Sequence, residues 1–181
     1  TNMYRAYTGR TIWSDVNGEY CDPCETIRKL DNPDSPMFGC DAFWNTFWNL
    51  NQLWTLVNPD IANKWVKSEL EMYKYGGWLS RGPAGIEYSA IMVASHEIPL
   101  IVSAYQKGIR NFDVNMAYEA IIHQQTVQGI RYPCGGSAGN EQLDTYIKSG
   151  YMPIDSGYTS NTLEYAYDDW CIATMAKAMR K

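Results

Sequence analysis

From residue 41 onward, apolar residues recur every three or four positions, and this spacing predicts a mainly α-helical chain. The strongest amphipathic pattern follows Asp113, a natural N-cap, where the apolar residues from Val114 to Ile122 share one helix face. The last helix differs because it is apolar on two faces, which is typical of a helix buried on both sides. Six helices are expected, and they start near residues 41, 58, 86, 113, 140 and 160.

Capping residues and helix breakers refine these elements. Asn58 is a natural N-cap with Pro59 at the first helical position, and Gly76-Gly77 should end that helix. The third helix is expected to cover about Tyr88 to Lys107. Because Pro99 lies inside it, a kink or a break is expected just before that residue.

Residues 1–40 lack helical periodicity and predict an extended, irregular segment. The dipeptide Asn17-Gly18 lies between β-type residues and predicts a hairpin turn. We therefore divide the chain into this segment and a helical part over 41–181. Helices joined in sequence pack most simply as antiparallel hairpins. Three such hairpins would form about half of a twelve-helix α/α toroid, and the alternative is a self-contained bundle.

Composition narrows the range of functions. The net charge is −5, and Lys and Arg do not cluster, so nucleic acid and anionic membranes are poor partners. Seven Trp and fourteen Tyr among only 19% charged residues are compatible with sugar binding, although a Trp-rich core explains them equally well. The chain contains no run of eighteen apolar residues, so no membrane span is predicted. The first ten residues contain neither an apolar signal-peptide core nor an initiator Met, so a processed or excised chain is expected.

Five cysteines are present, and Cys21 and Cys24 form the motif CDPC. A single CxxC motif is weak support for zinc or redox chemistry, since zinc sites usually need a second pair of ligands. A local disulfide or reduced thiols explain the motif at least as well. A zinc or redox site, a local disulfide and reduced thiols therefore all stay open as interpretations.

The last helix begins with three acids, Glu164, Asp168 and Asp169, and ends with bases. This order matches the helix dipole, and Asn161 with Glu164 resembles a capping box. Alternatively, Glu164 and Asp168 are neighbours four residues apart that could act as an acid and base pair. Side chains on one helix face point the same way and do not easily flank a glycosidic bond, so we interpret the acids as structural.

Five segments, in order, carry a family resemblance: FWNTFWNLNQLWTLVNPD, YKYGGWL, HEIPLIVSAYQKGIRNFDVNMAYEAI, YIKSGYMPID and TLEYAYDDWCIA. They resemble segments of glycoside hydrolase family 92, the calcium-dependent α-mannosidases. The resemblance covers residues 41–181 and implies an (α/α)6 toroid whose loops line a mannose pocket. It further implies exo-acting, inverting hydrolysis of terminal α-linked mannose in a secreted, periplasmic or cell-surface enzyme.

The family's acid-bearing segments, which resemble EGNxWQY and GNDDxGQM, do not occur in this chain. The resemblance therefore implies that the catalytic carboxylates lie elsewhere, that the catalytic residues here are unknown, and that this chain alone is inactive. Calcium is expected for the complete family enzyme, with no metal ligand assigned here. The expected partners are α-mannoside glycans and the remainder of the catalytic domain, and the exposed edge should cause self-association. The rival function is a non-catalytic helical module that binds a glycan or a protein.

The resemblance also selects candidate substrate-binding residues: Trp44, Asn45, Trp78, His96 and Glu97. Trp44 could stack on a sugar face while Asn45 bonds hydroxyl groups, and His96 and Glu97 lie just before a break expected at the pocket. For each, a structural role in the core is about as plausible.

Two departures from the family pattern affect the expected specificity. Many members have Asp where this chain has Asn45, and Arg where it has Trp48. Because Asp only accepts hydrogen bonds whereas Asn both donates and accepts, the pattern of hydroxyl recognition is expected to differ.

Overall fold

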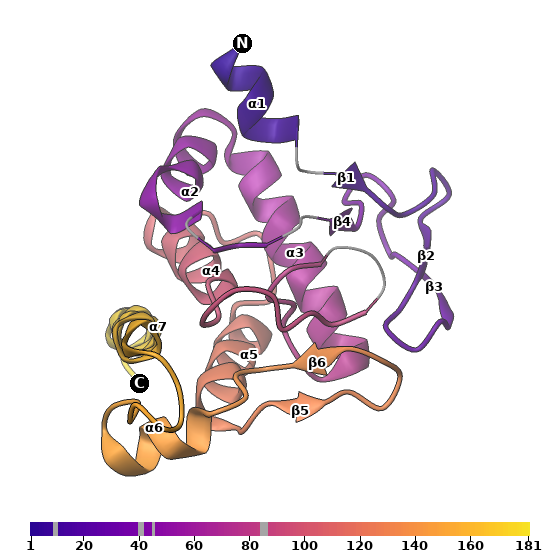
Figure 1. Ribbon diagram of the computed structural model, residues 1–181. Helices are drawn as coiled ribbons and strands as arrows, with labels where there is room; N and C mark the ends of the chain where they lie inside the picture. The colour runs from indigo at the N-terminus through magenta and orange to yellow at the C-terminus, as the bar shows by residue number, and fades with distance from the viewer. Residues whose placement is uncertain (9–10, 40–41, 45, 84–86) are drawn as a thin grey trace.

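The structure is a computed structural model, and it describes residues 1–8, 11–39, 42–44, 46–83 and 87–181. Helices dominate these residues, as predicted, and the strands are short two-stranded ladders (Figure 1). The helices are α1 (Asn2–Thr8), α2 (Thr46–Val57), α3 (Pro59–Gly76), α4 (Glu97–Gln106), α5 (Val114–Thr126), α6 (Leu143–Ser149) and α7 (Thr159–Met179). The strands are β1 (Thr11–Ile12), β2 (Glu19–Cys21), β3 (Ile27–Lys29), β4 (Phe38–Gly39), β5 (Ile130–Arg131) and β6 (Ser137–Ala138).

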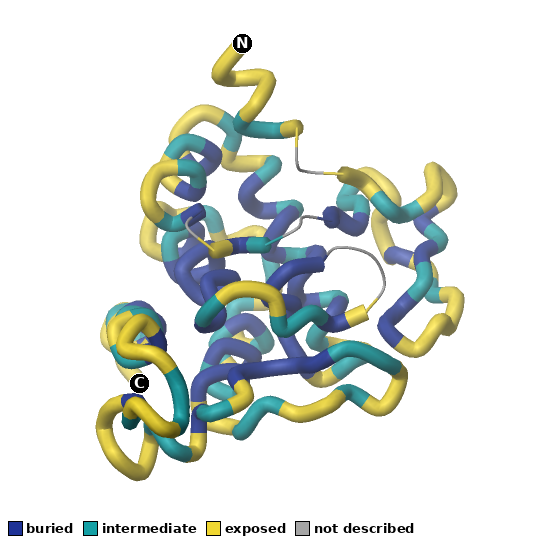
Figure 2. The backbone as a smooth tube through the Cα atoms, viewed as in Figure 1, coloured by how far each residue is buried: buried dark blue, intermediate teal, exposed yellow. Residues whose placement is uncertain are grey.

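Helix α4 is the centre of the fold, because it packs against α2, α3, α5 and α7 (Figure 1). Helices α2, α4 and α7 form one row, in which α4 contacts both of its neighbours. Helices α3, α5 and α6 form a second row alongside it. The main hydrophobic core lies between the rows and includes residues of α3, α4 and α5, of which α4 is mostly buried and dark blue in Figure 2. The mainly α-helical fold is thus confirmed.

Local capping explains the bounds of α3. The Asn58 side chain accepts a hydrogen bond from Ile61 N at 3.4 Å, and Pro59 occupies the first turn, where no N–H is needed. At the other end, Gly77 has a φ of +80° and donates its N–H to Tyr73 O. These ends agree with the sequence prediction, and so does the Asp113 cap of α5, whose carboxylate accepts from Met116 N at 2.9 Å.

The third helix was predicted too long. Only Glu97–Gln106 are helical, and the segment from Tyr88 to Ser95 is irregular. Pro99 lies in the first turn of α4, where its missing N–H costs nothing, so it marks the start of a helix rather than a kink within one. The preceding segment is fixed by tertiary bonds instead, since the buried Tyr88 hydroxyl donates toward Met72 O and Trp78 O at 2.8 and 2.9 Å.

The N-terminal segment also differs from the prediction. It begins with the exposed helix α1, and its hairpin pairs β2 with β3 around residues 22–26 rather than around Asn17-Gly18. The Asp22 carboxylate forms that connection by accepting from the N–H groups of Cys24 and Thr26, both at 2.9 Å. Gly18, with a φ of +85°, instead closes a separate turn by donating to Asp15 O.

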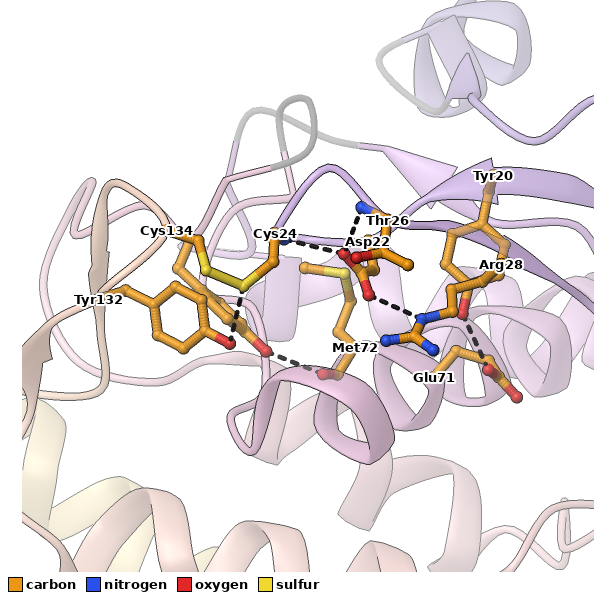
Figure 3. Close-up of polar contacts among 10 residues, drawn as sticks. Tyr20, Asp22, Cys24, Thr26, Arg28, Glu71, Met72, Tyr132 and Cys134 are labelled. Carbon is orange, nitrogen blue, oxygen red and sulfur yellow. Dashed lines mark hydrogen bonds and ion pairs between the residues drawn. A yellow bond between two sulfur atoms is a disulfide. The ribbon is translucent and has the colours of Figure 1, made fainter.

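A disulfide between Cys24 and Cys134 ties this hairpin to the loop between β5 and β6 (Figure 3). The two cysteines are separated by 110 residues, so the bond is not the local one considered for CDPC. Cys21 remains a free thiol. Because Cys24 is oxidised, the zinc reading of Cys21 and Cys24 is wrong.

Helix α7 begins at Thr159, two residues before the cap predicted at Asn161. Asn161 is instead the third helical residue, and its side chain accepts from Tyr158 N at 3.1 Å. The capping box with Glu164 is therefore wrong, and Glu164 is free to contact another element. No helix among the described residues is long and apolar enough to cross a membrane.

Candidate functional site

The N-terminal parts of α2, α4 and α7 meet around His96, one of the candidate residues. His96 directly precedes α4, and its Nε2 lies 2.8 Å from Glu164 Oε2 on α7. The edge of the imidazole also meets the Phe47 ring of α2, with ring centroids 4.6 Å apart. His96 is only 1% exposed, whereas the Glu164 side chain is 23% exposed. Within this chain, Glu164 therefore offers more surface to a ligand than His96 does.

Burial controls the charge of this contact. Burial, together with the positive charge of Arg81, lowers the pKa of His96 to about 4. Burial also raises the pKa of Glu164. The imidazole is therefore neutral at pH 7, and its contact with Glu164 is a polar contact rather than a pair of full charges.

Behind His96 lies a buried carboxyl cluster made of Glu69, Glu97 and Asp168, all with 0% exposure. Each acid accepts one hydrogen bond from a different segment: Glu69 from Ser80 N, Glu97 from Gln124 Nε2 and Asp168 from Ser95 N, at 2.8, 2.8 and 2.9 Å. The cluster thus ties α3, α4, α5 and α7 together across the core.

Burial raises the pKa of all three acids in the cluster, that of Glu97 to about 7. Repulsion from Glu97 adds to the rise for Glu69 and Asp168. Burial favours the neutral form of a carboxyl group because a low-dielectric interior solvates charge poorly. The three carboxyl groups are therefore harder to ionise than exposed ones, and they are closed to solvent within this chain.

The predicted substrate-binding residues fall into different surroundings. Trp44 is 39% exposed and lies beside Trp48, with ring centroids 6.4 Å apart. Glu97 belongs to the buried carboxyl cluster and has no exposed surface in this chain. Asn45 lies outside the described residues. Their contacts with a sugar stay predictions.

Trp78 lies in a second core cluster with Met72 and Tyr88. It is 6% exposed, and its ring lies 4.4 Å from that of His123. Trp44 thus lies just before α2 and His96 just before α4, while Trp78 is buried in the second core cluster. A role for Trp78 at the pocket rim stays a prediction.

Asp168 and Asp169 of α7 bond to neighbouring segments and have structural roles. Asp168 is held by Ser95 N, and Asp169 accepts from the Tyr146 hydroxyl of α6 at 2.8 Å. These bonds to neighbouring segments agree with the structural interpretation drawn from the sequence. Glu164 and Asp168 therefore do not form an exposed pair of carboxylates.

The donor groups that the structure describes do not converge on a metal site. Among these residues, no three His, Cys, Asp or Glu side chains are grouped so that they could hold a metal ion. The described residues therefore do not fit a calcium site on their own, and no step through calcium is derived for them.

Comparison with known proteins decides the family. Residues 1–181 match the sequence profile described as the glycosyl hydrolase family 92 catalytic domain. The chain belongs to glycosyl hydrolase family 92. The resemblance inferred from five segments is thereby confirmed over the whole chain, including the N-terminal part.

Solved family 92 structures share the fold. One is an inverting mannosidase from Bacteroides thetaiotaomicron, with a TM-score of 0.86 and 27% identity over 99% of this chain and 24% of that one. Another is an α-mannosidase from the same organism in complex with mannoimidazole, with a TM-score of 0.85 and 26% identity over 98% of this chain and 22% of that one.

A curated relative, an uncharacterized secreted glycosidase from Arthroderma benhamiae, is 27% identical over 166 residues, or 78% of this chain and 21% of its own length. The chain thus spans about a fifth to a quarter of each of these three proteins.

Sequence reasoning missed two polar residues of this family 92 chain, Glu69 and Gln124, and it missed the contact that Glu164 makes. A signal for these two residues exists. Glu69 follows the buried Trp65 by four positions, and Gln124 follows the buried Ile121 by three, so both lie on the apolar face of their helix. Nothing local indicated that Glu164 would meet His96, because that contact depends on how α4 and α7 pack.

Proposed function

We propose that this chain is the part of an exo-acting α-mannosidase that surrounds a terminal α-linked mannose, while the acid and the base that cleave the bond lie outside it. The observation that carries the proposal is the whole-length match to the family 92 catalytic domain. The superposition on mannosidases of this family supports it. The preferred linkage is not part of the proposal.

The positions of the acidic residues support the proposal that bond cleavage is carried out by residues outside this chain. Glycoside hydrolysis needs two carboxyl groups that flank the scissile bond, about 5–5.5 Å apart with retention and about 6.5–9.5 Å apart with inversion. Glu69, Glu97 and Asp168 are fully buried here, and Glu164 lies against His96. Glu69, Glu97 and Asp168 therefore serve the scaffold, and we propose that the complete enzyme inverts configuration with carboxylates from other segments.

The chain's own residues would bind and orient the sugar. The exposed ring of Trp44 offers a flat apolar face, and the partly exposed Glu164 carboxyl on α7 can accept hydroxyl hydrogen bonds. Calcium, which we propose for the complete enzyme, would take its ligands from the longer protein. A secreted, periplasmic or cell-surface location is proposed from the family and from the description of the fungal relative.

The remainder of the catalytic domain is the proposed partner of the exposed apolar side chains on α2 and α7. Trp48, Leu163 and Trp170 are 66%, 69% and 61% exposed. Large exposed apolar patches usually mark interfaces. Self-association of the isolated chain through this surface is part of the proposal.

A nuclear magnetic resonance titration tests sugar binding. On adding methyl α-mannopyranoside to the 15N-labelled chain, we expect the Trp44 indole N–H signal to shift saturably. Methyl α-glucopyranoside should cause a smaller shift, and Trp44→Ala should weaken the binding measured at neighbouring signals. An indole signal that does not respond to mannoside, or that responds equally to both sugars, would contradict the proposed function.

A further inference from the structure

The segment of residues 90–94, which ends two positions before His96, has an unusual backbone conformation. Met92 and Ala94 adopt positive φ angles of +63° and +61°. This left-handed region is sterically unfavourable for a residue with a Cβ atom, so it persists only where surrounding contacts impose it. Among the described residues, no backbone–backbone hydrogen bond involves residues 90–94. The segment therefore depends on contacts with side chains for its conformation.

Arg81 makes these contacts. Its Nη1 donates to Met92 O at 2.9 Å and lies 3.5 Å from Ala90 O, and its Nη2 donates to Gly139 O, just after β6. The side chain is buried, and within the described part of the chain it forms no ion pair with a carboxylate. A guanidinium group presents several N–H donors in fixed directions. A single arginine can therefore hold the 90–94 segment and the residue after β6 at the same time.

Asp168 holds the chain on the other side of the 90–94 segment. Ser95 N donates to Asp168 Oδ2 at 2.9 Å, and both residues are fully buried. The next residue, His96, lies with its Nε2 2.8 Å from Glu164 Oε2, on the same helix α7 as Asp168. The bonds to Arg81 and to Asp168 thus lie on either side of the two left-handed residues. Together they determine where the imidazole meets the Glu164 carboxyl.

We propose that Arg81 is a positioning residue of the sugar site, which holds the 90–94 segment in its left-handed conformation and thereby places His96 against Glu164. Arg81 does not contact the sugar in this arrangement, because it acts through the backbone. That Glu164 accepts hydrogen bonds from mannose rests on the proposed function, whereas the link from Arg81 to His96 rests on the contacts within this chain. Lysine should not replace Arg81, because its ammonium group lacks the planar fork of donors.

The first test compares Arg81→Lys with the original 181-residue chain, both labelled with 13C and 15N. Lysine keeps the positive charge, so a change at His96 would report a change of geometry. The readout is the nuclear Overhauser effect between the His96 and Phe47 rings, whose centroids are 4.6 Å apart. We expect this effect to weaken in Arg81→Lys, and an unchanged intensity would overturn the inference. The matched control is Arg110→Lys, because Arg110 Nε also donates to a backbone carbonyl, that of Tyr105, at 3.0 Å.

The second readout is the affinity for methyl α-mannopyranoside, measured from the shift of the Trp44 indole signal. Arg81→Lys should bind about tenfold more weakly, as expected for the loss of one hydrogen bond to a carboxylate, whereas Arg110→Lys should bind as the original chain does. If Trp44 of the original chain does not respond, the proposed function fails, and the ring contact still tests the placement of His96. If Trp44 responds equally in Arg81→Lys, the inference fails and the proposed function stands.

A rescue variant separates positioning from a general effect on stability. Glycine adopts a positive φ without steric cost, and the Met92 side chain is 49% exposed, so Met92→Gly should favour the native segment with little loss of packing. Adding Met92→Gly to Arg81→Lys should restore part of the ring contact and of the affinity. A double variant no better than Arg81→Lys would contradict the inference. If Arg81→Lys does not fold and Met92→Gly does not restore folding, Arg81 supports the whole fold and the inference is wrong.

Discussion

Replacing both Cys24 and Cys134 with serine is expected to lower the free energy of unfolding by about 4–5 kcal/mol. The disulfide joins residues 110 positions apart, so it removes a large amount of chain entropy from the unfolded state. It also holds the hairpin of β2 and β3 against the loop between β5 and β6 (Figure 3). Urea unfolding of both proteins without reductant, followed by tryptophan fluorescence, measures the difference.

The matched control for this prediction is Cys21→Ser, which removes a free thiol three residues from the bond. Cys21 is only partly buried and serine is of similar size, so the unfolding free energy should change by less than about 0.5 kcal/mol. A double variant that loses less than about 1 kcal/mol would show that this crosslink does not stabilise the fold.

Replacing Glu97 with glutamine is expected to make the free energy of unfolding less sensitive to a rise in pH from 4.5 to 8. Burial raises the pKa of Glu97 from 4.5 to about 7, so the folded chain holds this proton where the unfolded chain has released it. The folded state binds more protons in that range, and its stability therefore falls as the pH rises from 4.5 through 7. With 1.36 kcal/mol for each unit, the loss amounts to about 3 kcal/mol at pH 8, and glutamine does not titrate.

Unfolding free energies of Glu97→Gln and the original chain should be compared from pH 4.5 to pH 8. The unfolding free energy of Glu97→Gln minus that of the original chain should rise by about 3 kcal/mol across this range. The lowered pKa of His96 acts with the opposite sign, since it makes stability rise with pH between about 4 and 6.5, but it affects both proteins alike. The exposed Glu141→Gln serves as the control, and a difference that does not vary with pH would refute the buried-proton interpretation.

Local signals predicted the helices whose ends are set by their own sequence. Asn58, Gly77 and Asp113 each satisfy backbone groups within a few residues, so α3 and α5 could be predicted from the sequence. The segment before α4 could not, because its conformation depends on the Tyr88 hydroxyl reaching Met72 O and Trp78 O. Periodic apolar residues alone did not distinguish that buried, irregular segment from a helix.

The candidate site shows the same distinction between features set by local sequence and features set by tertiary contacts. Motifs selected Trp44 and His96 as candidates, and both lie close to the start of a helix in the row of α2, α4 and α7. They did not reveal that Glu97 turns into the core or that Cys24 pairs with Cys134, since both outcomes depend on residues distant in sequence.

The central claim is that this chain shapes a sugar site while the acids that cleave the bond belong to other segments. The most direct test is the release of nitrophenol from 4-nitrophenyl α-mannopyranoside by the purified 181-residue chain, with and without calcium. We predict a rate no greater than that of the buffer alone under both conditions. Sustained turnover that is proportional to the protein concentration would contradict the claim, since the required carboxylates would then lie within these residues.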